Sequence, residues 1–104
     1  MARRHREVIW TLQGQAMLDA ALSYIAEDSL AAAQRMLERA LDAAASLSTL
    51  SERGRMVPEL NSPEIREVFV QRYRLIYEIR DTKIEVLAFL HSARDFSKWS
   101  SEPE

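Results

Sequence analysis

The sequence predicts a single α+β domain in which an antiparallel pair of helices packs on a mainly antiparallel β-sheet. Three observations predict this fold: a short strand-like run at Arg6–Thr11, two helical runs within Leu12–Leu50, and three strand-like runs after Glu64. Helices grouped together before a set of strands are typical of α+β folds. A chain of 104 residues has the usual size of one domain, and we expect its ends, residues 1–5 and 100–104, to be flexible.

The first strand-like run reads REVIWT, in which β-branched and aromatic residues favour an extended chain. It ends at Thr11, whose hydroxyl group can cap the helix that follows. From Leu12 to Glu27, apolar residues recur at the spacing i, i+3, i+4 and i+7, which places them on one side of a helix. These residues are Leu18, Ala21, Leu22 and Ile25.

A second helix is predicted from Leu30 to Leu50, after a break and a new cap at Asp28-Ser29. Its apolar stripe is rich in alanine, so this helix can lie close to a neighbouring element. Because only one or two residues separate the helices, they should fold back on each other as an antiparallel hairpin. Both apolar stripes need a cover, which the downstream sheet can provide.

The second half of the chain predicts the sheet. A loop at Ser51–Glu64 contains one glycine and two prolines, and the strand-like runs Ile65–Gln71, Tyr73–Arg80 and Lys83–Leu90 follow it. If Asp81-Thr82 forms a two-residue turn, Arg80 faces Lys83, Tyr77 faces Val86 and Leu75 faces Ala88. This register places an apolar face against the helices, made of Tyr73, Leu75, Tyr77, Ile79, Ile84, Val86, Ala88 and Leu90.

The opposite face of the predicted hairpin mixes charges with an apolar strip. The strip consists of Ile76, Leu87 and Phe89, and the polar members of the face are Arg74, Glu78, Arg80, Glu85 and His91. An exposed apolar strip of this kind is typical of a binding site. The alternative is that the C-terminal segment, with Phe96 and Trp99, folds back over the strip, and both interpretations stay open.

The composition excludes several classes of function. The chain has no cysteine, which excludes disulfides and cysteine-ligated zinc. Its two histidines argue against a dedicated transition-metal site, so we expect no metal and no cofactor. No apolar run approaches the roughly 20 residues of a membrane-spanning helix, and the start lacks the apolar core of a signal peptide. We therefore expect a cytoplasmic protein without a membrane partner. A net charge of −2 argues against a general nucleic-acid binder, which is usually basic.

Several stretches resemble the RelE/ParE superfamily of toxins from bacterial type II toxin–antitoxin systems. The matching stretches are Trp10-Thr11, Tyr24-Ile25, Ala32-Ala33, GRMVPEL at Gly54–Leu60, IRE at Ile65–Glu67, YRLIYEI at Tyr73–Ile79 and VLAFLHSAR at Val86–Arg94. The resemblance spans nearly the whole chain. It implies a toxin that inhibits growth and is neutralised by a cognate antitoxin, with operator DNA bound only indirectly, through that antitoxin. Such antitoxins fold on binding, and we expect this one to contact Ile76, Leu87, Phe89 and Arg80 and the groove beside the helices.

The superfamily divides by target, so the resemblance leaves two activities open. ParE-type members poison DNA gyrase, whereas RelE-type members cut messenger RNA at the ribosome without a metal. Resemblance to the YoeB branch of RNases implies catalytic roles for Glu59, Arg74 and His91. In the predicted register, Arg74 and His91 share one face on adjacent strands, where both can reach one phosphate. The arginines Arg53, Arg55, Arg66 and Arg94 are then the expected target contacts.

Each of these residues also has a structural interpretation. His91 can cap the sheet, Glu59 can pair with Arg55 or Arg66, and Arg74 can anchor an antitoxin carboxylate. Basic and acidic residues are almost balanced in the second half of the chain, whereas affinity for ribosomal RNA comes mainly from phosphate contacts. This balance favours the gyrase hypothesis slightly over the endoribonuclease hypothesis. A third hypothesis is a non-toxic protein-interaction module of the same fold.

Overall fold

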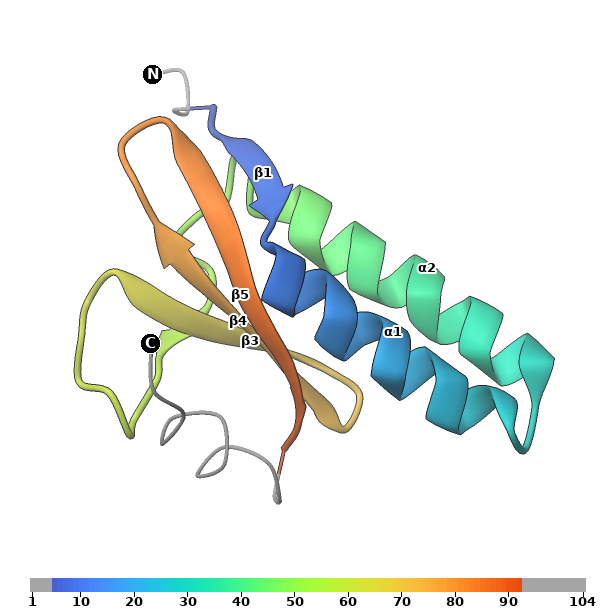
Figure 1. Ribbon diagram of the computed structural model, residues 1–104. Coiled ribbons are helices and arrows are strands. Elements are labelled where there is room, and N and C mark those ends of the chain that lie inside the picture. Colours follow the sequence, from blue (N-terminus) through green and yellow to red (C-terminus); the bar gives the residue numbers. More distant parts are fainter. Residues whose placement is uncertain (1–4, 93–104) are drawn as a thin grey trace.

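The computed structural model describes residues 5–92 of the chain (Figure 1). Its elements follow in the order β1 (Glu7–Trp10), α1 (Leu12–Ala26), α2 (Leu30–Ser46), β2 (Arg55–Met56), β3 (Ile65–Val70), β4 (Tyr73–Ile79) and β5 (Lys83–His91). The predictions made for Arg94, Phe96, Trp99 and most of the two chain ends lie outside the described residues.

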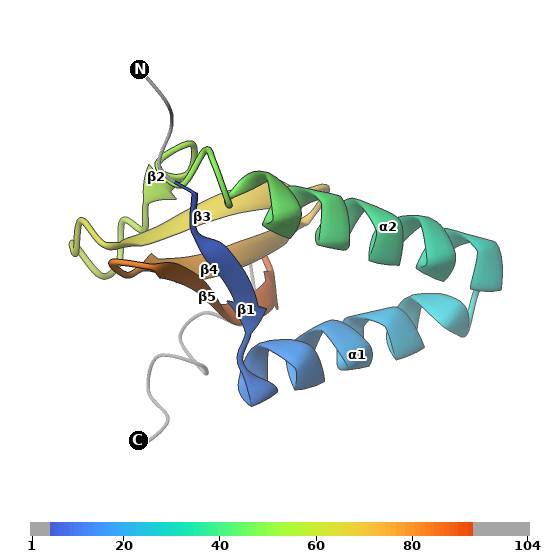
Figure 2. The same cartoon turned by 90° about the horizontal axis from the view of Figure 1, so that it is seen from above.

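One five-stranded sheet has the strand order β1-β5-β4-β3-β2, with β1 parallel to β5 and the other neighbours antiparallel. The two helices cover one face of this sheet, with α1 along β5 and α2 nearer β3 (Figure 2). This arrangement confirms the predicted α+β fold. The sequence did not predict β2, because two exposed residues are too few to show an alternation.

The helices begin where the caps were predicted. The Thr11 hydroxyl accepts a hydrogen bond from Gly14 N at 3.0 Å, and the Ser29 hydroxyl accepts one from Ala32 N at 3.1 Å. Helix α2 ends at Ser46, four residues earlier than predicted. The apolar stripe runs past the end of the helix because Leu47, which is fully buried, enters the core from the turn that follows.

Helix α1 starts in direct contact with the backbone of β5. The Val86 carbonyl oxygen accepts hydrogen bonds from Thr11 N at 3.1 Å and from the Thr11 hydroxyl at 2.9 Å. A Cβ atom on Gly14 would lie only 2.5 Å from the same oxygen. Glycine at this position therefore lets the first turn of α1 approach the sheet.

The β4–β5 hairpin follows the predicted register only near its turn. Arg80 N donates to Lys83 O at 2.9 Å, and Tyr77 pairs with Val86, as predicted. A β-bulge then leaves Leu87 as an extra residue on β5, between the pairs made by Ile76 and Tyr77.

Beyond this bulge, every β5 side chain lies on the face opposite to the predicted one, because a shift of one residue exchanges the two faces. Leu75 pairs with Phe89 and not with Ala88, Arg74 pairs with Leu90, and Tyr73 pairs with His91. The prediction that Arg74 and His91 share a face is therefore wrong.

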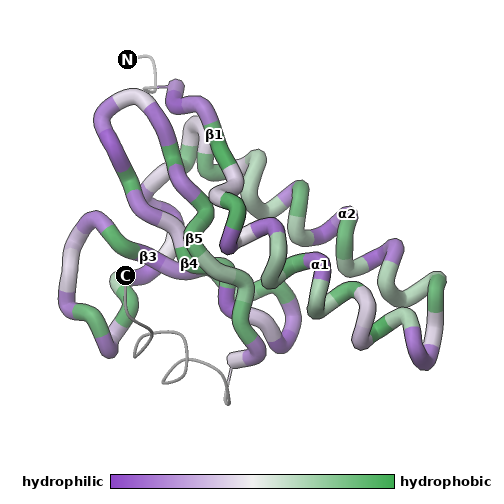
Figure 3. The backbone as a smooth tube through the Cα atoms, in the orientation of Figure 1, coloured by the Kyte–Doolittle hydropathy of each residue, from purple (hydrophilic) through white to green (hydrophobic). Residues whose placement is uncertain are grey.

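The bulge also divides the apolar side chains between two clusters. Hydrophobic residues lie along the middle of the sheet, around β4 and β5 (Figure 3). The main core lies between the sheet and the helices and includes Phe89, which is 2% exposed. A second cluster, made of Val57, Ile76, Ala88 and Leu90, lies on the other side of the sheet, where the loop after β2 covers it. The predicted exposed strip does not exist, since Ile76 and Phe89 are buried on opposite sides and Leu87 is half-buried.

We expect Gly14→Ala to lower the free energy of unfolding by about 2 kcal/mol. The added methyl group meets a backbone oxygen that cannot rotate away, which costs about 3 kcal/mol, and the gain in helix propensity of about 1 kcal/mol does not offset this. Urea unfolding followed by circular dichroism measures the difference. Gln13→Ala, at an exposed position in the same helical turn, is the matched control and should change stability by less than about 0.5 kcal/mol. Equal stability of the two variants would contradict the close approach.

Candidate functional site

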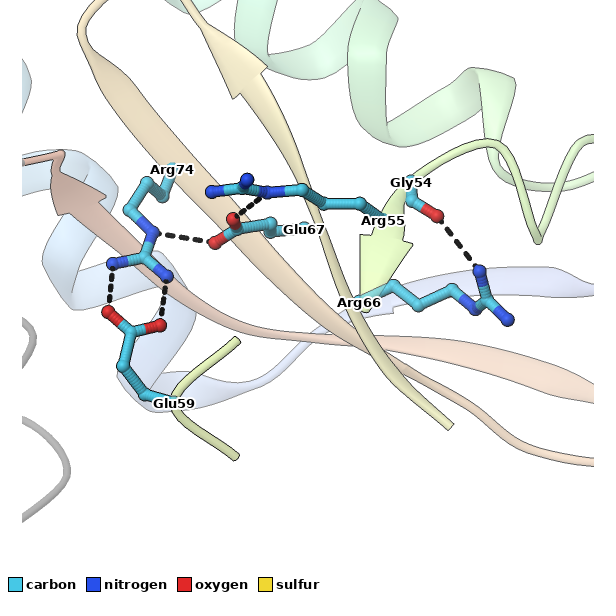
Figure 4. Close-up of polar contacts among 6 residues, drawn as sticks. All are labelled: Gly54, Arg55, Glu59, Arg66, Glu67 and Arg74. Atoms are coloured by element: carbon cyan, nitrogen blue, oxygen red, sulfur yellow. Dashed lines mark hydrogen bonds and ion pairs between the residues drawn. The ribbon is translucent and has the colours of Figure 1, made fainter. Parts of the chain in front are cut away.

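Four charged side chains form a continuous ion-pair chain on the sheet face away from the helices (Figure 4). Glu67 accepts from Arg55 Nε and from Arg74 Nε, each at 2.6 Å, through its two carboxylate oxygens. The other two nitrogens of the Arg74 guanidinium donate to the carboxylate of Glu59 at 2.8 and 3.1 Å. The order Arg55–Glu67–Arg74–Glu59 defines the ion-pair chain.

Three different elements position the ion-pair chain. Strands β3 and β4 pair Glu67 with Ile76 and Phe69 with Arg74, so these side chains project from the same face. Glu59 comes from the loop after β2, which is held down by Val57 and Leu60 in the second apolar cluster. The loop is therefore fixed to the sheet both by apolar contacts and by charge.

Burial differs strongly along the ion-pair chain. The Glu67 side chain is fully buried and that of Arg74 is 5% exposed, whereas Glu59 is 44% and Arg55 58% exposed. The hydrogen bonds from Arg74 hold the pKa of Glu59 below its usual value, and Glu59 in turn raises the pKa of Arg74. Two arginines and two glutamates make the chain electrically neutral. The chain therefore offers no net positive charge to a phosphate, because each arginine is already paired with a carboxylate.

The residues predicted for the site from sequence do not include Glu67, which joins the two arginines. The next residue along β3, Val68, faces the helices. Phe69, two residues after Glu67, is exposed, and its ring lies 5.3 Å from the Arg55 guanidinium. The structure pairs Glu59 with Arg74, whereas the structural interpretation from sequence paired it with Arg55 or Arg66. Only the pairing of β3 with β4 reveals that one buried carboxylate joins both arginines.

Two other predicted arginines lie at the β2 edge of the sheet and donate to neutral acceptors. Arg53 donates to the Ser46 hydroxyl at 2.8 Å, and Arg66 donates to the carbonyl oxygens of Gly54 at 3.0 Å and Pro63 at 3.1 Å. Within residues 5–92, neither arginine has a carboxylate partner. Their positive charges are therefore available at this edge.

Gly54 holds this edge close to the sheet. Its backbone N donates to the Tyr77 hydroxyl at 3.0 Å, and that hydroxyl donates to Ser51 O at 2.7 Å. A Cβ atom on Gly54 would lie 2.6 Å from both the Tyr77 hydroxyl and Glu67 O. Burial raises the pKa of Tyr77, so the phenol remains protonated and keeps both hydrogen bonds.

His91 lies on the helix side of the sheet, away from the ion-pair chain. Tyr73 stacks on Phe89 with ring centres 4.9 Å apart, and His91 meets Tyr73 edge-on at 5.6 Å. Of the three predicted catalytic residues, the structure thus brings Glu59 and Arg74 together and separates His91 from them by the thickness of the sheet. Arg80, predicted to contact an antitoxin, is half-exposed and pairs with Glu85 at 2.6 Å and Glu78 at 3.2 Å.

The described part of the chain offers neither a cluster of metal ligands nor a membrane-spanning helix. Residues 5–92 contain no group of three His, Asp or Glu side chains that could hold a metal ion. None of the helices formed by these residues is both long enough and apolar enough to cross a membrane.

Comparisons with known proteins agree with this fold. A family model described as "ParE toxin of type II toxin-antitoxin system, parDE" matches residues 8–96. The chain belongs to the ParE toxin family. This confirms the predicted RelE/ParE superfamily and supports a cognate antitoxin as the partner of the toxin.

Two known proteins are similar to this chain. Toxin RelE2 from Caulobacter vibrioides is 37% identical over 89 residues, which cover 85% of this chain and 97% of that protein. A solved structure of the chromosomal ParDE TA system from P. aeruginosa matches with a TM-score of 0.69 at 16% identity, covering 85% of the toxin and 97% of that chain. At this identity the structural match shows the fold alone.

We expect Glu67→Gln to lower the free energy of unfolding by about 3–5 kcal/mol, because it removes the negative charge between two arginines, one of which is buried. Chemical denaturation of the purified toxin measures the loss. Glu64→Gln makes the same chemical change at an exposed position where the carboxylate meets only the Ser62 hydroxyl, and it should be nearly neutral. A Glu67→Gln toxin as stable as the Glu64→Gln control would show that the ion-pair chain contributes little.

Proposed function

We propose that the toxin stops growth by binding and inhibiting DNA gyrase, and that it does not cut RNA. The observation that carries this proposal is the position of His91 across the sheet from Arg74 and Glu59. Cleavage of RNA without a metal needs a base, an acid and cations around one phosphate. A single phosphate cannot touch both faces of a sheet at once.

The ion-pair chain supports the same conclusion. Arg74 already donates to two carboxylates, Glu67 and Glu59. A phosphate could bind the guanidinium only by displacing Glu59, and Glu67 would keep part of the positive charge neutralised. Glu59 itself is held in its charged form by Arg74, which makes it a weak base at neutral pH.

The overall charge adds a weaker argument. With a net charge of −2, the toxin lacks the overall positive charge that favours binding to RNA phosphates. The charges of the exposed Arg53 and the half-buried Arg66 instead form a local edge suited to one specific contact. We assign these two arginines to target binding. Arg55 joins them, because Glu67 accepts only from its Nε and leaves the other two guanidinium nitrogens for the target.

Supercoiling of relaxed plasmid DNA by purified gyrase tests the proposed target. We expect the toxin to inhibit the reaction, and His91→Ala to inhibit it with a half-inhibitory concentration within about twofold of the wild type. A binding inhibitor does not need the imidazole, whereas the catalytic role implied by the YoeB resemblance does. Messenger RNA on translating ribosomes should stay intact in the presence of either protein.

Two results would contradict the proposal. Transcripts cut by the wild type but intact with Arg74→Ala or His91→Ala would establish the metal-independent endoribonuclease. Cells that express the protein without antitoxin and grow normally, with gyrase activity and transcripts unaffected, would support the third hypothesis, a non-toxic interaction module.

The role of the arginine edge has its own test in the supercoiling assay. We expect the double variant Arg53→Ala/Arg66→Ala to raise the half-inhibitory concentration at least about tenfold, because each lost charge-assisted hydrogen bond is worth about 1.5–3 kcal/mol. Arg35→Ala/Arg39→Ala changes the net charge by the same amount on the exposed side of α2 and should have little effect. Equal effects of the two double variants would mean that overall charge, and not this edge, governs inhibition.

A further inference from the structure

An aromatic ring and an arginine lie together on the sheet face away from the helices. Phe69 is the one exposed residue of β3, with 53% of its surface accessible, and the Arg55 guanidinium lies 5.3 Å from its ring centre. Glu67 accepts only from Arg55 Nε, so the other two nitrogens of this guanidinium can still donate. Aromatic residues and arginines dominate the binding energy of protein–protein interfaces, and this pair offers both at one place.

Gly54 is the point where two further arginines gather. Arg53 and Arg55 flank it in the chain, and Arg66 donates to its carbonyl oxygen at 3.0 Å (Figure 4). Glu52, which precedes Arg53, is exposed and forms no ion pair with these arginines among residues 5–92. Guanidinium groups whose donors are only partly used bind carboxylates well, so the surface beside Phe69 suits an acidic partner.

The backbone of β3 is open beside Phe69. On the β2 side, Ile65 O accepts from Val57 N at 3.2 Å, and the alternation along the strand turns the N–H and C=O of Phe69 to that same side. β2 pairs with only two of the six residues of β3 and stops short of Phe69, because Arg53 N instead donates to Leu50 O at 3.0 Å. On that side, residues 5–92 provide no strand to pair with Phe69. An open edge of this kind can accept an added strand.

From these observations we infer that gyrase is bound through an extended, acidic segment that pairs with β3 beside Phe69. An apolar side chain of the segment packs on the Phe69 ring, and its carboxylates accept from Arg53 and Arg55. The inference rests on the proposed function, since it describes how the proposed target is held. A peptide fits better than a nucleic acid, because the open edge offers backbone hydrogen bonds and the half-exposed carboxylate of Glu59 lies on the same face.

The affinity of purified gyrase for the toxin, measured without DNA, tests the role of the ring. We expect Phe69→Ala to weaken binding at least about tenfold, as for an aromatic residue at the centre of an interface, and Phe69→Tyr to stay within about threefold of the wild type. Tyr24→Ala removes an exposed aromatic side chain on the helix side and is the matched control, with an expected change below about twofold. Equal effects of Phe69→Ala and Tyr24→Ala would overturn the inference.

Two charged substitutions at Phe69 test the acidity of the segment, because both remove the ring and differ only in sign. We expect gyrase to bind the Phe69→Lys toxin at least about fivefold more tightly than the Phe69→Glu toxin, and salt should reduce this difference. Equal affinity, or the reverse order, would exclude an acidic segment. Single-stranded or duplex DNA that binds the wild type and Phe69→Lys but not Phe69→Glu would assign the surface to nucleic acid instead.

Hydrogen exchange of the isotope-labelled toxin tests the added strand. In the free toxin, we expect the Phe69 amide to exchange at least about tenfold faster than that of Val68, which the same alternation directs to β4. Gyrase should slow the Phe69 amide and leave Val68 unchanged. A Phe69 amide that is as protected as Val68 in the free toxin, or that gyrase does not slow, would exclude strand addition.

The supercoiling assay separates failure of this inference from failure of the proposed function. If Phe69→Ala inhibits gyrase as strongly as the wild type does, gyrase remains the target and this surface is not its binding site. If the wild type itself neither binds nor inhibits gyrase, the proposed function is wrong and the inference falls with it.

Discussion

One extra residue in β5 determines what each face of this sheet carries. Without the bulge at Leu87, Phe89 and His91 would project beside Arg74, and Ala88 and Leu90 would enter the main core. With it, an aromatic side chain and the imidazole reach the helices, and the opposite face receives the small apolar residues that the loop after β2 can cover. Bulges are frequent next to functional sites because they redirect side chains without ending a strand. Here the bulge also follows Val86, whose carbonyl oxygen anchors the first turn of α1, so the register of the hairpin and the placement of the helix are set at the same point.

The buried carboxylate of Glu67 plays the corresponding role on the other face. A fully buried charge is tolerated only when it is paired, and Glu67 is paired twice. Through Arg74 it fixes Glu59 and with it the loop above the second apolar cluster, so residues that resemble a catalytic pair in the sequence hold the fold together in the structure. The family defines the partner as an antitoxin. The surface carries two different features: a charged edge formed by Arg53 and Arg66, and a hollow on the helix side lined by Tyr73, Phe89 and His91.

Much of the fold could be predicted from sequence, because periodicity and caps are local signals. The two helices, the Thr11 and Ser29 caps, the Asp81-Thr82 turn and the α+β class all follow from patterns within a few residues of each other. The bulge could not be predicted, since the stretch from Val86 to Leu90 is apolar throughout and no change of polarity marks the extra residue. The predicted shared face of Arg74 and His91 is wrong for that reason alone, because the position of His91 depends on an uninterrupted alternation, whereas Glu59 and Arg74 do meet. The burial of Glu67 was equally hidden, because it depends on the pairing of β3 with β4.

The separate apolar cluster beneath the loop has a consequence for how this fold can diverge. Val57 comes from the loop itself and packs with Ile76, Ala88 and Leu90, whereas the helix side has its own larger core. Substitutions in the loop after β2 therefore act mainly on a small set of side chains, which includes Met17 of α1, and on the charges that hold the loop. The loop side of the sheet can therefore change its surface while the core on the helix side stays the same.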